Sequence, residues 1–129
     1  MSQWTHVNAS FRLDSIGYIP DERIEEVFGK EIRYDDLYDY DETSTVKTLP
    51  MGSEGSLNIS VWHNPDRCCM ASTTVTVFGD LRDYGGDSDI EKLKEWFNNC
   101  CNEFMVRQAI MQIQDEWQKD TIVVEYKGK

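Results

Sequence analysis

Hydrophobic and polar residues alternate along the first part of the chain, over residues 4–13. One side of this pattern carries Val7, Ala9, Phe11 and Leu13, and the other carries His6, Asn8, Ser10 and Arg12. Successive side chains of a strand point to opposite faces, so the alternation predicts a half-buried β-strand. Similar patterns over residues 57–63, 72–83 and 109–114 predict three further strands, and residues 121–126, which are rich in β-forming residues, predict a last one. For residues 109–114, a helix that continues through Gln114 is the alternative.

Two other segments have the period of an amphipathic helix. The first opens at Pro20, carries acidic residues in its first turn and stops at Gly29, as is typical of helix ends. The second has Ser88 and Glu91 at the spacing of a capping box and is expected to end near Phe104. Its apolar stripe consists of Ile90, Leu93, Phe97, Cys100 and Phe104.

The order of these elements is strand, helix, two strands, helix, two strands. With right-handed crossovers, this order predicts one α+β domain over residues 1–129. The expected fold is a ferredoxin-like two-layer sandwich, with two helices on one face of an antiparallel sheet and an extra C-terminal hairpin. An irregular acidic loop at residues 30–56 interrupts the pattern. Within it we expect a short edge strand over residues 43–49 and a turn over residues 50–56.

The charge of the chain restricts its partners. The formal net charge is −11, with 24 acidic residues against 13 lysines and arginines. Nucleic-acid binding normally needs basic residues, so direct binding of nucleic acid is disfavoured. Acidity favours a basic partner, although it also simply keeps a small protein in solution. The apolar runs are too short to cross a bilayer, and the N-terminus does not resemble a signal peptide, so we expect a cytoplasmic protein without membrane contact.

The four cysteines form two adjacent pairs, Cys68-Cys69 and Cys100-Cys101. Adjacent cysteines do not easily reach one metal ion, so free thiols are expected, with neither a metal nor a cofactor. His63 lies close enough in sequence to join a metal site or to activate Cys68 as a nucleophile. Neighbours in a tight turn seldom reach that geometry, so we expect no catalytic residue and no enzymatic activity.

Candidate ligand-binding residues come from two features. The sheet face without helices is polar but carries aromatic residues, and the glycine- and serine-rich turn at residues 52–56 offers amides and hydroxyls for an anion. A nucleotide would need Arg12 and Arg82 close to this turn, with Trp62 or Phe78 to stack the base. A solvated face and a simple turn are the alternatives. The candidate set is Arg12, Gly52, Ser53, Gly55, Ser56, Trp62, Phe78, Asp80, Arg82, Asp83 and Tyr84.

Acidic residues and tyrosines mix over residues 34–42. This segment lacks the central glycine and the late glutamate of an EF-hand, so a docking segment for a basic partner is favoured over a calcium site. A solvated loop is the alternative. The candidate partner-binding residues are Tyr34, Asp35, Asp36, Tyr38, Asp39, Tyr40 and Asp41.

Several strings of the sequence together carry a likeness to known proteins. They are residues 4–8 (WTHVN), 50–57 (PMGSEGSL), 64–65 (NP), 78–84 (FGDLRDY) and 106–108 (VRQ). With these strings the chain resembles a group of small proteins encoded by bacteriophages and prophages, for which no activity is established.

The resemblance implies a non-enzymatic phage accessory protein in the host cytoplasm. Such a protein would bind a host protein or a small nucleotide-like ligand, and would counteract host defence by sequestering a nucleotide-type signal or by inhibiting an effector. The alternative is a homo-oligomeric structural or assembly module of a phage, in which a homodimer forms through the bare sheet face or an edge strand.

Overall fold

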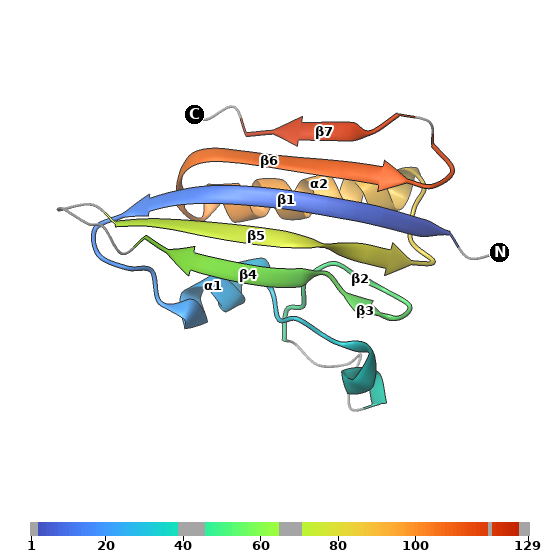
Figure 1. Ribbon diagram of the computed structural model, residues 1–129, viewed down its shortest axis with the longest axis horizontal. Helices are drawn as coiled ribbons and strands as arrows, with labels where there is room; N and C mark the ends of the chain where they lie inside the picture. Colours follow the sequence, from blue (N-terminus) through green and yellow to red (C-terminus); the bar gives the residue numbers. More distant parts are fainter. Residues whose placement is uncertain (1–2, 39–45, 65–70, 119, 127–129) are drawn as a thin grey trace.

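Five antiparallel strands form the main sheet, in the spatial order β4-β5-β1-β6-β7 (Figure 1). The computed structural model describes residues 3–38, 46–64, 71–118 and 120–126. The strands of this sheet are β1 (Trp4–Ser15), β4 (Asn58–His63), β5 (Ala71–Arg82), β6 (Met105–Asp115) and β7 (Ile122–Glu125). Two α-helices, α1 (Asp21–Phe28) and α2 (Asp87–Asn102), complete an α+β fold, which confirms the predicted class.

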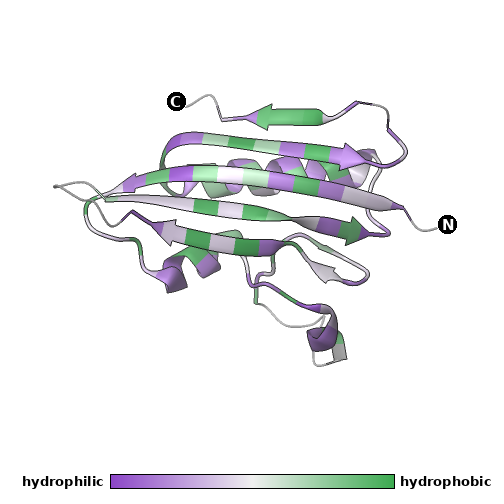
Figure 2. Cartoon of the chain, in the orientation of Figure 1, coloured by the Kyte–Doolittle hydropathy of each residue, from purple (hydrophilic) through white to green (hydrophobic). Residues whose placement is uncertain are grey.

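The strands β1, β4, β5 and β6 follow the predicted alternation of hydrophobic and polar residues (Figure 2). The segment for which a helix was the alternative is a strand, β6, and it begins at Met105, directly after α2. Ala109, Met111 and Ile113 of this strand are buried, whereas Gln112 and Gln114 are exposed. A strand buries one residue in two, so this period decides against a helix.

Both helices pack on the same face of the sheet. Phe11, in the central strand β1, is fully buried, and its ring lies 4.8 Å from that of Phe28 in α1 and 5.2 Å from that of Phe97 in α2. The indole N–H of Trp96 donates a 2.9 Å hydrogen bond to the carbonyl oxygen of Phe28, which joins the two helices. In the part of the chain that the structure describes, no helix therefore covers the opposite face of the sheet.

The helix ends differ in part from the predictions. Pro20 and Gly29 flank α1 as expected. The predicted capping box of α2 is wrong, because the helix begins at Asp87, its N-cap residue is Gly86, and no side chain caps it. Ser88 lies inside the first turn, and the carboxylate of Asp89 accepts a hydrogen bond from the amide of Gly85 instead. Phe104 lies beyond the end of α2, since the chain turns into β6 there.

The acidic loop contains more structure than expected. A 3₁₀ helix, η1 (Tyr34–Tyr38), is followed by a small hairpin of β2 (Met51–Gly52) and β3 (Gly55–Ser56). The predicted edge strand over residues 43–49 is wrong for residues 46–49, which form only an isolated bridge between Thr48 and Lys30, and residues 43–45 lie outside the described ranges. This bridge passes so close to Gly29 that a Cβ atom there would lie 2.4 Å from backbone atoms of Thr48 and Leu49.

Asp115, at the end of β6, ties three segments together. It is only 2% exposed. Its carboxylate accepts hydrogen bonds from the Gln3 side chain (2.7 Å), the Trp117 amide (3.0 Å) and the Gly86 amide (3.3 Å). Burial alone would raise the pKa of Asp115, but these three donors favour the charged carboxylate, and the net result is a lowered pKa. The N-terminus, the β5–α2 connection and the β6–β7 connection are thereby fixed to one side chain.

Neither helix in the part of the chain that the structure describes is long and apolar enough to cross a membrane.

Candidate functional site

The uncovered face of the sheet contains a hollow of about 600 Å³, which we call the open-face hollow. Two rows of residues cross it from strand to strand. The pairing of β5, β1, β6 and β7 places Phe78, Asn8, Gln112 and Val123 in one row. The neighbouring row consists of Asp80, His6 and Gln114, with Thr121 beside them, and the paired residues Val7 and Gly79 lie between the two rows.

The first row has an apolar residue at each end. Phe78 is 41% exposed and Val123 is 51% exposed. Neighbouring strands lie about 4.8 Å apart, so the backbones of these two residues are three spacings, or about 14 Å, from each other. Asn8 and Gln112 lie between them and are exposed. The hollow thus has an amide floor between an aromatic wall and an aliphatic wall.

The charge in the hollow is negative. Asp80 is exposed, and its carboxylate is paired with the Nδ1 atom of His6. Among the residues that the structure describes, no lysine or arginine lines the hollow. The neighbouring Arg82 instead pairs with Glu54 at 2.9 Å, and its guanidinium lies 6.0 Å from the centre of the Trp4 ring.

The predicted convergence of Arg12 and Arg82 does not occur. Arg12 lies opposite Thr74 of β5, whereas Arg82 lies opposite Trp4 of β1. Eight residues of β5 separate these positions, which is about 26 Å at 3.3 Å per residue. Trp62 is also opposite Thr74 and therefore belongs to the Arg12 end of the face, away from the hollow. The alternation put both arginines on the correct face but contained no information on their distance along it.

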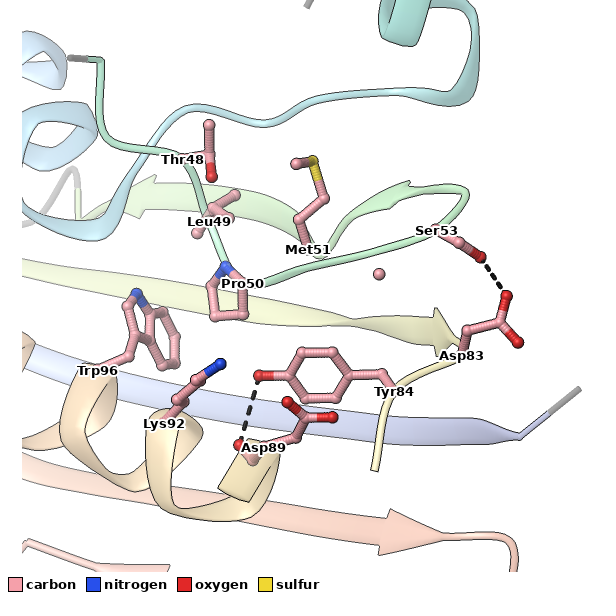
Figure 3. Close-up of a pocket in the computed structure, with 11 residues that line it drawn as sticks. Thr48, Leu49, Pro50, Met51, Ser53, Asp83, Tyr84, Asp89, Lys92 and Trp96 are labelled. Carbon is pink, nitrogen blue, oxygen red and sulfur yellow. Dashed lines mark hydrogen bonds between the residues drawn. The ribbon is translucent and has the colours of Figure 1, made fainter. Parts of the chain in front are cut away.

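Four other predicted ligand-binding residues meet at a second depression, the hairpin cleft, of about 480 Å³ (Figure 3). Gly52 and Ser53 line it from the hairpin, and Asp83 and Tyr84 line it from the chain after β5. The Ser53 hydroxyl donates a 2.7 Å hydrogen bond to the Asp83 carboxylate. The remaining lining comes from residues 48–51 and from Asp89, Lys92 and Trp96 of α2.

Gly55 and Ser56 hold the hairpin in place. The Ser56 amide donates to the carbonyl oxygen of Ile32, and the Ser56 hydroxyl accepts from the Ile32 amide. Gly55 is buried with a φ of 123°, and a Cβ atom there would lie 2.8 Å from the Ile32 carbonyl oxygen. The Ser53 amide also donates internally, to the carbonyl oxygen of Arg82. These two amides are therefore occupied, and the expected anion nest loses them as donors.

Two residues give the hairpin cleft its electrostatic character. Burial, and secondarily the negative charge of Asp89, raise the pKa of Tyr84 to about 12, so that its phenol is neutral at ordinary pH. Asp83 has a φ of 55°, a left-handed conformation that aspartate tolerates better than most residues. The Asp83 amide donates to the Gln3 carbonyl oxygen, so that this conformation is held by the chain around it.

The acidic segment is partly described. Tyr34, Asp35 and Asp36 are exposed in η1, which lies apart from the sheet (Figure 1). The Asp36 carboxylate accepts a 3.1 Å hydrogen bond from the Arg33 amide and so caps the first turn of η1. Tyr38 is the last residue of η1, and Asp39, Tyr40 and Asp41 lie outside the described residues.

His63, considered from the sequence as a partner of Cys68, contacts the side chains of Asp21, Thr73 and Tyr18. Its Nε2 atom lies 3.1 Å from the Asp21 carboxylate, and its Nδ1 atom lies 3.1 Å from the hydroxyl of the buried Thr73. The ring of Tyr18 packs beside the imidazole at 5.1 Å. Cys68 lies outside the described ranges.

Cys100 and Cys101 are buried, and burial raises the pKa of each thiol to about 12. Both thiols are therefore protonated at ordinary pH. Among residues 3–38, 46–64, 71–118 and 120–126, no three His, Cys, Asp or Glu residues gather where they could hold a metal ion.

Eight residues of the open-face hollow are outside the sequence-based set: His6, Asn8, Gln112, Gln114, Val7, Gly79, Thr121 and Val123. The first two were predicted on the uncovered face, but nothing in the sequence placed β6 and β7 beside β1. The three glutamines at positions 108, 112 and 114, all on one side of the alternation, were the pattern that could have drawn attention to β6.

Comparison of the chain with models of protein families, with curated protein sequences and with solved structures finds no match.

Proposed function

We propose that the chain is a non-enzymatic phage accessory protein that binds a basic host protein and inhibits it, thereby counteracting host defence. The observation that carries the proposal is the position of η1, which holds Tyr34, Asp35 and Asp36 exposed and apart from the sheet (Figure 1). A net charge of −11 would draw a basic surface towards this segment.

The inhibitor version is favoured over a protein that sequesters a nucleotide signal. The sequestering version needs two arginines around one phosphate group, and Arg12 and Arg82 lie about 26 Å apart. Arg82 is also paired with Glu54. An inhibitor needs no such convergence, because exposed charges at the rim of an interface act mainly through association rate and salt dependence.

Neutralising η1 tests this proposal. The double variant Asp35→Asn and Asp36→Asn is expected to weaken binding of the host partner roughly tenfold, since each exposed charge pair contributes up to about 1 kcal/mol. Binding by the unmodified protein should also weaken steeply with salt. Native mass spectrometry of the protein, purified gently from a bacterial host lysate, identifies the partner, and titration at two salt concentrations measures the affinity.

The matched control is the double variant Glu95→Gln and Glu116→Gln, which removes the same charge at two exposed positions away from η1. It should retain the partner. If both double variants weaken binding of the partner equally, only the net charge matters and η1 has no specific role. If the η1 variant binds the partner as tightly as the unmodified protein, the proposal is contradicted.

A homo-oligomeric assembly module is the second candidate, because β7 is an edge strand that is almost wholly hydrophobic (Figure 2). Tyr126 donates its amide to Ala109 of β6, so the amide of Val123, three residues earlier, points away from β6. Such an edge can pair with a second copy. Sedimentation should then depend on concentration, and Val123→Pro should leave a monomer; a monomer at every concentration would contradict this candidate.

We also propose that the sheet is ferredoxin-like. The four longest strands are arranged β4-β5-β1-β6, and α2 connects two of them, β5 and β6, that are separated by β1. The connection from β1 to β4, which contains α1, likewise passes over β5. On this view β7 is the extra strand of the C-terminal hairpin. An experimental structure superposed on ferredoxin-like domains tests the proposal.

A further inference from the structure

We propose that the open-face hollow binds an uncharged nucleobase or nucleoside. This site is separate from η1, so the inference does not depend on the proposed inhibition of a host protein. It follows from three properties of the hollow: its two walls, the amides of its floor and the sign of its charge.

The walls suit a flat, aromatic ligand. The ring of Phe78 is exposed at one end of the row and Val123 at the other, about 14 Å away across β1 and β6. Bases stack on exposed aromatic side chains whatever their sequence, because every base has a π-face. A planar heterocycle stacked on the Phe78 ring would lie over the floor of the hollow, on the side towards Val123.

The floor supplies the polar contacts. Asn8, Gln112 and Gln114 each carry an amide with two N–H donors and one carbonyl acceptor. All three side chains line the hollow, and none of them forms a hydrogen bond with another residue that the structure describes. A side-chain amide can form two hydrogen bonds with the N6 and N7 atoms of adenine. The amides therefore favour adenosine as the first ligand to test.

The charge of the hollow argues against a phosphate group. The carboxylate of Asp80 lines the hollow, and none of the described residues that line it is a lysine or an arginine. Arg82, the nearest arginine along β5, pairs with Glu54. The imidazole of His6 is already paired with Asp80, so a phosphate would meet like charge without a free cation among the described residues of the lining. The ligand class is therefore the free base or nucleoside, which differs from the nucleotide signal that was expected from the sequence.

Nuclear magnetic resonance titration of the ¹⁵N-labelled protein with adenosine tests the inference. We expect the side-chain NH₂ resonances of Asn8, Gln112 and Gln114 to shift on addition of adenosine up to about 10 mM, which would nearly saturate a site with a Kd of ~1 mM. Adenosine monophosphate should bind at least several-fold more weakly. Phe78→Leu, which keeps an apolar side chain but removes the stacking surface, should weaken adenosine binding roughly tenfold.

Trp62→Ala is the matched control, since Trp62 is an exposed aromatic residue of the same face outside the hollow. It should bind adenosine as the unmodified protein does. Guanosine, cytidine and uridine, titrated in the same way, test whether another base is preferred. The inference is overturned if none of the four nucleosides shifts the three amides, if the monophosphate binds as tightly as adenosine, or if Trp62→Ala weakens binding as much as Phe78→Leu.

Discussion

The variant Asp115→Ala is expected to lower the free energy of unfolding by about 3 kcal/mol. The Asp115 carboxylate is buried and accepts hydrogen bonds from the Gln3 side chain and from the amides of Gly86 and Trp117. Removing the acceptor leaves three donors of part-buried hydrogen bonds without their partner, and each such loss costs about 1 kcal/mol, the lower end of the range for an unsatisfied group. Urea unfolding, monitored by tryptophan fluorescence, measures the loss. Asp120→Ala, at an exposed position five residues later, should change stability by less than about 0.5 kcal/mol.

The same carboxylate makes stability depend on pH. Its pKa is lowered in the folded protein from an ordinary value of 3.8. The contribution of Asp115 is therefore complete above the unfolded pKa and is lost as the pH falls through the lower, folded pKa. Asp115→Asn should be destabilised near pH 6 but should lose less additional stability on acidification than the unmodified protein. Parallel acid-limb curves for the two proteins would contradict this assignment.

Gly29→Ala is the second variant for which we expect a large effect, a destabilisation of about 3 kcal/mol or more. Gly29 has a φ of 115°, and its added Cβ atom would lie 2.4 Å from backbone atoms of Thr48 and Leu49. Backbone strain at such a φ and a forced shift of the neighbouring segment each cost about 1–3 kcal/mol. Thermal and urea unfolding of the variant measure the sum.

Gly17→Ala separates the two causes. Gly17 also has a positive φ, 77°, but no atom lies within 4 Å of the added Cβ position. This control should lose only the conformational preference, about 1–2 kcal/mol. Equal losses at the two positions would mean that the contact between Gly29 and residues 48–49 contributes nothing.

Features that depend on the local spacing of hydrophobic residues could be predicted from the sequence. The alternation of Val7, Ala9, Phe11 and Leu13 identified the buried face of β1, and all four residues are buried. Pro20 and Gly29 marked the ends of α1 for stereochemical reasons that act within one turn. Local period also correctly favoured a strand over a helix for residues 109–114.

Features that depend on contacts between distant segments could not be predicted. The start of α2 depends on Gly85 and Gly86, whose amides are satisfied by Asp89 and by Asp115 of β6. Ser88 therefore lies inside the first turn of α2 and does not occupy the N-cap position. Likewise, the open-face hollow depends on the register that places Asn8 beside both Phe78 and Gln112. An alternation with a period of two residues shows which side chains of a strand face the core. It does not show which other strands lie beside that strand.

The central position of β1 has a consequence for how the protein is made. Thr5 is paired with Leu81 on one side and with Asp115 on the other, so both neighbours of this strand come from the later part of the chain. During synthesis, β1 leaves the ribosome long before either partner exists, and its apolar face stays exposed for that time. Pairings of such large sequence separation also slow folding. The period between translation of residue 15 and translation of residue 115 is therefore when the nascent chain most needs protection from aggregation.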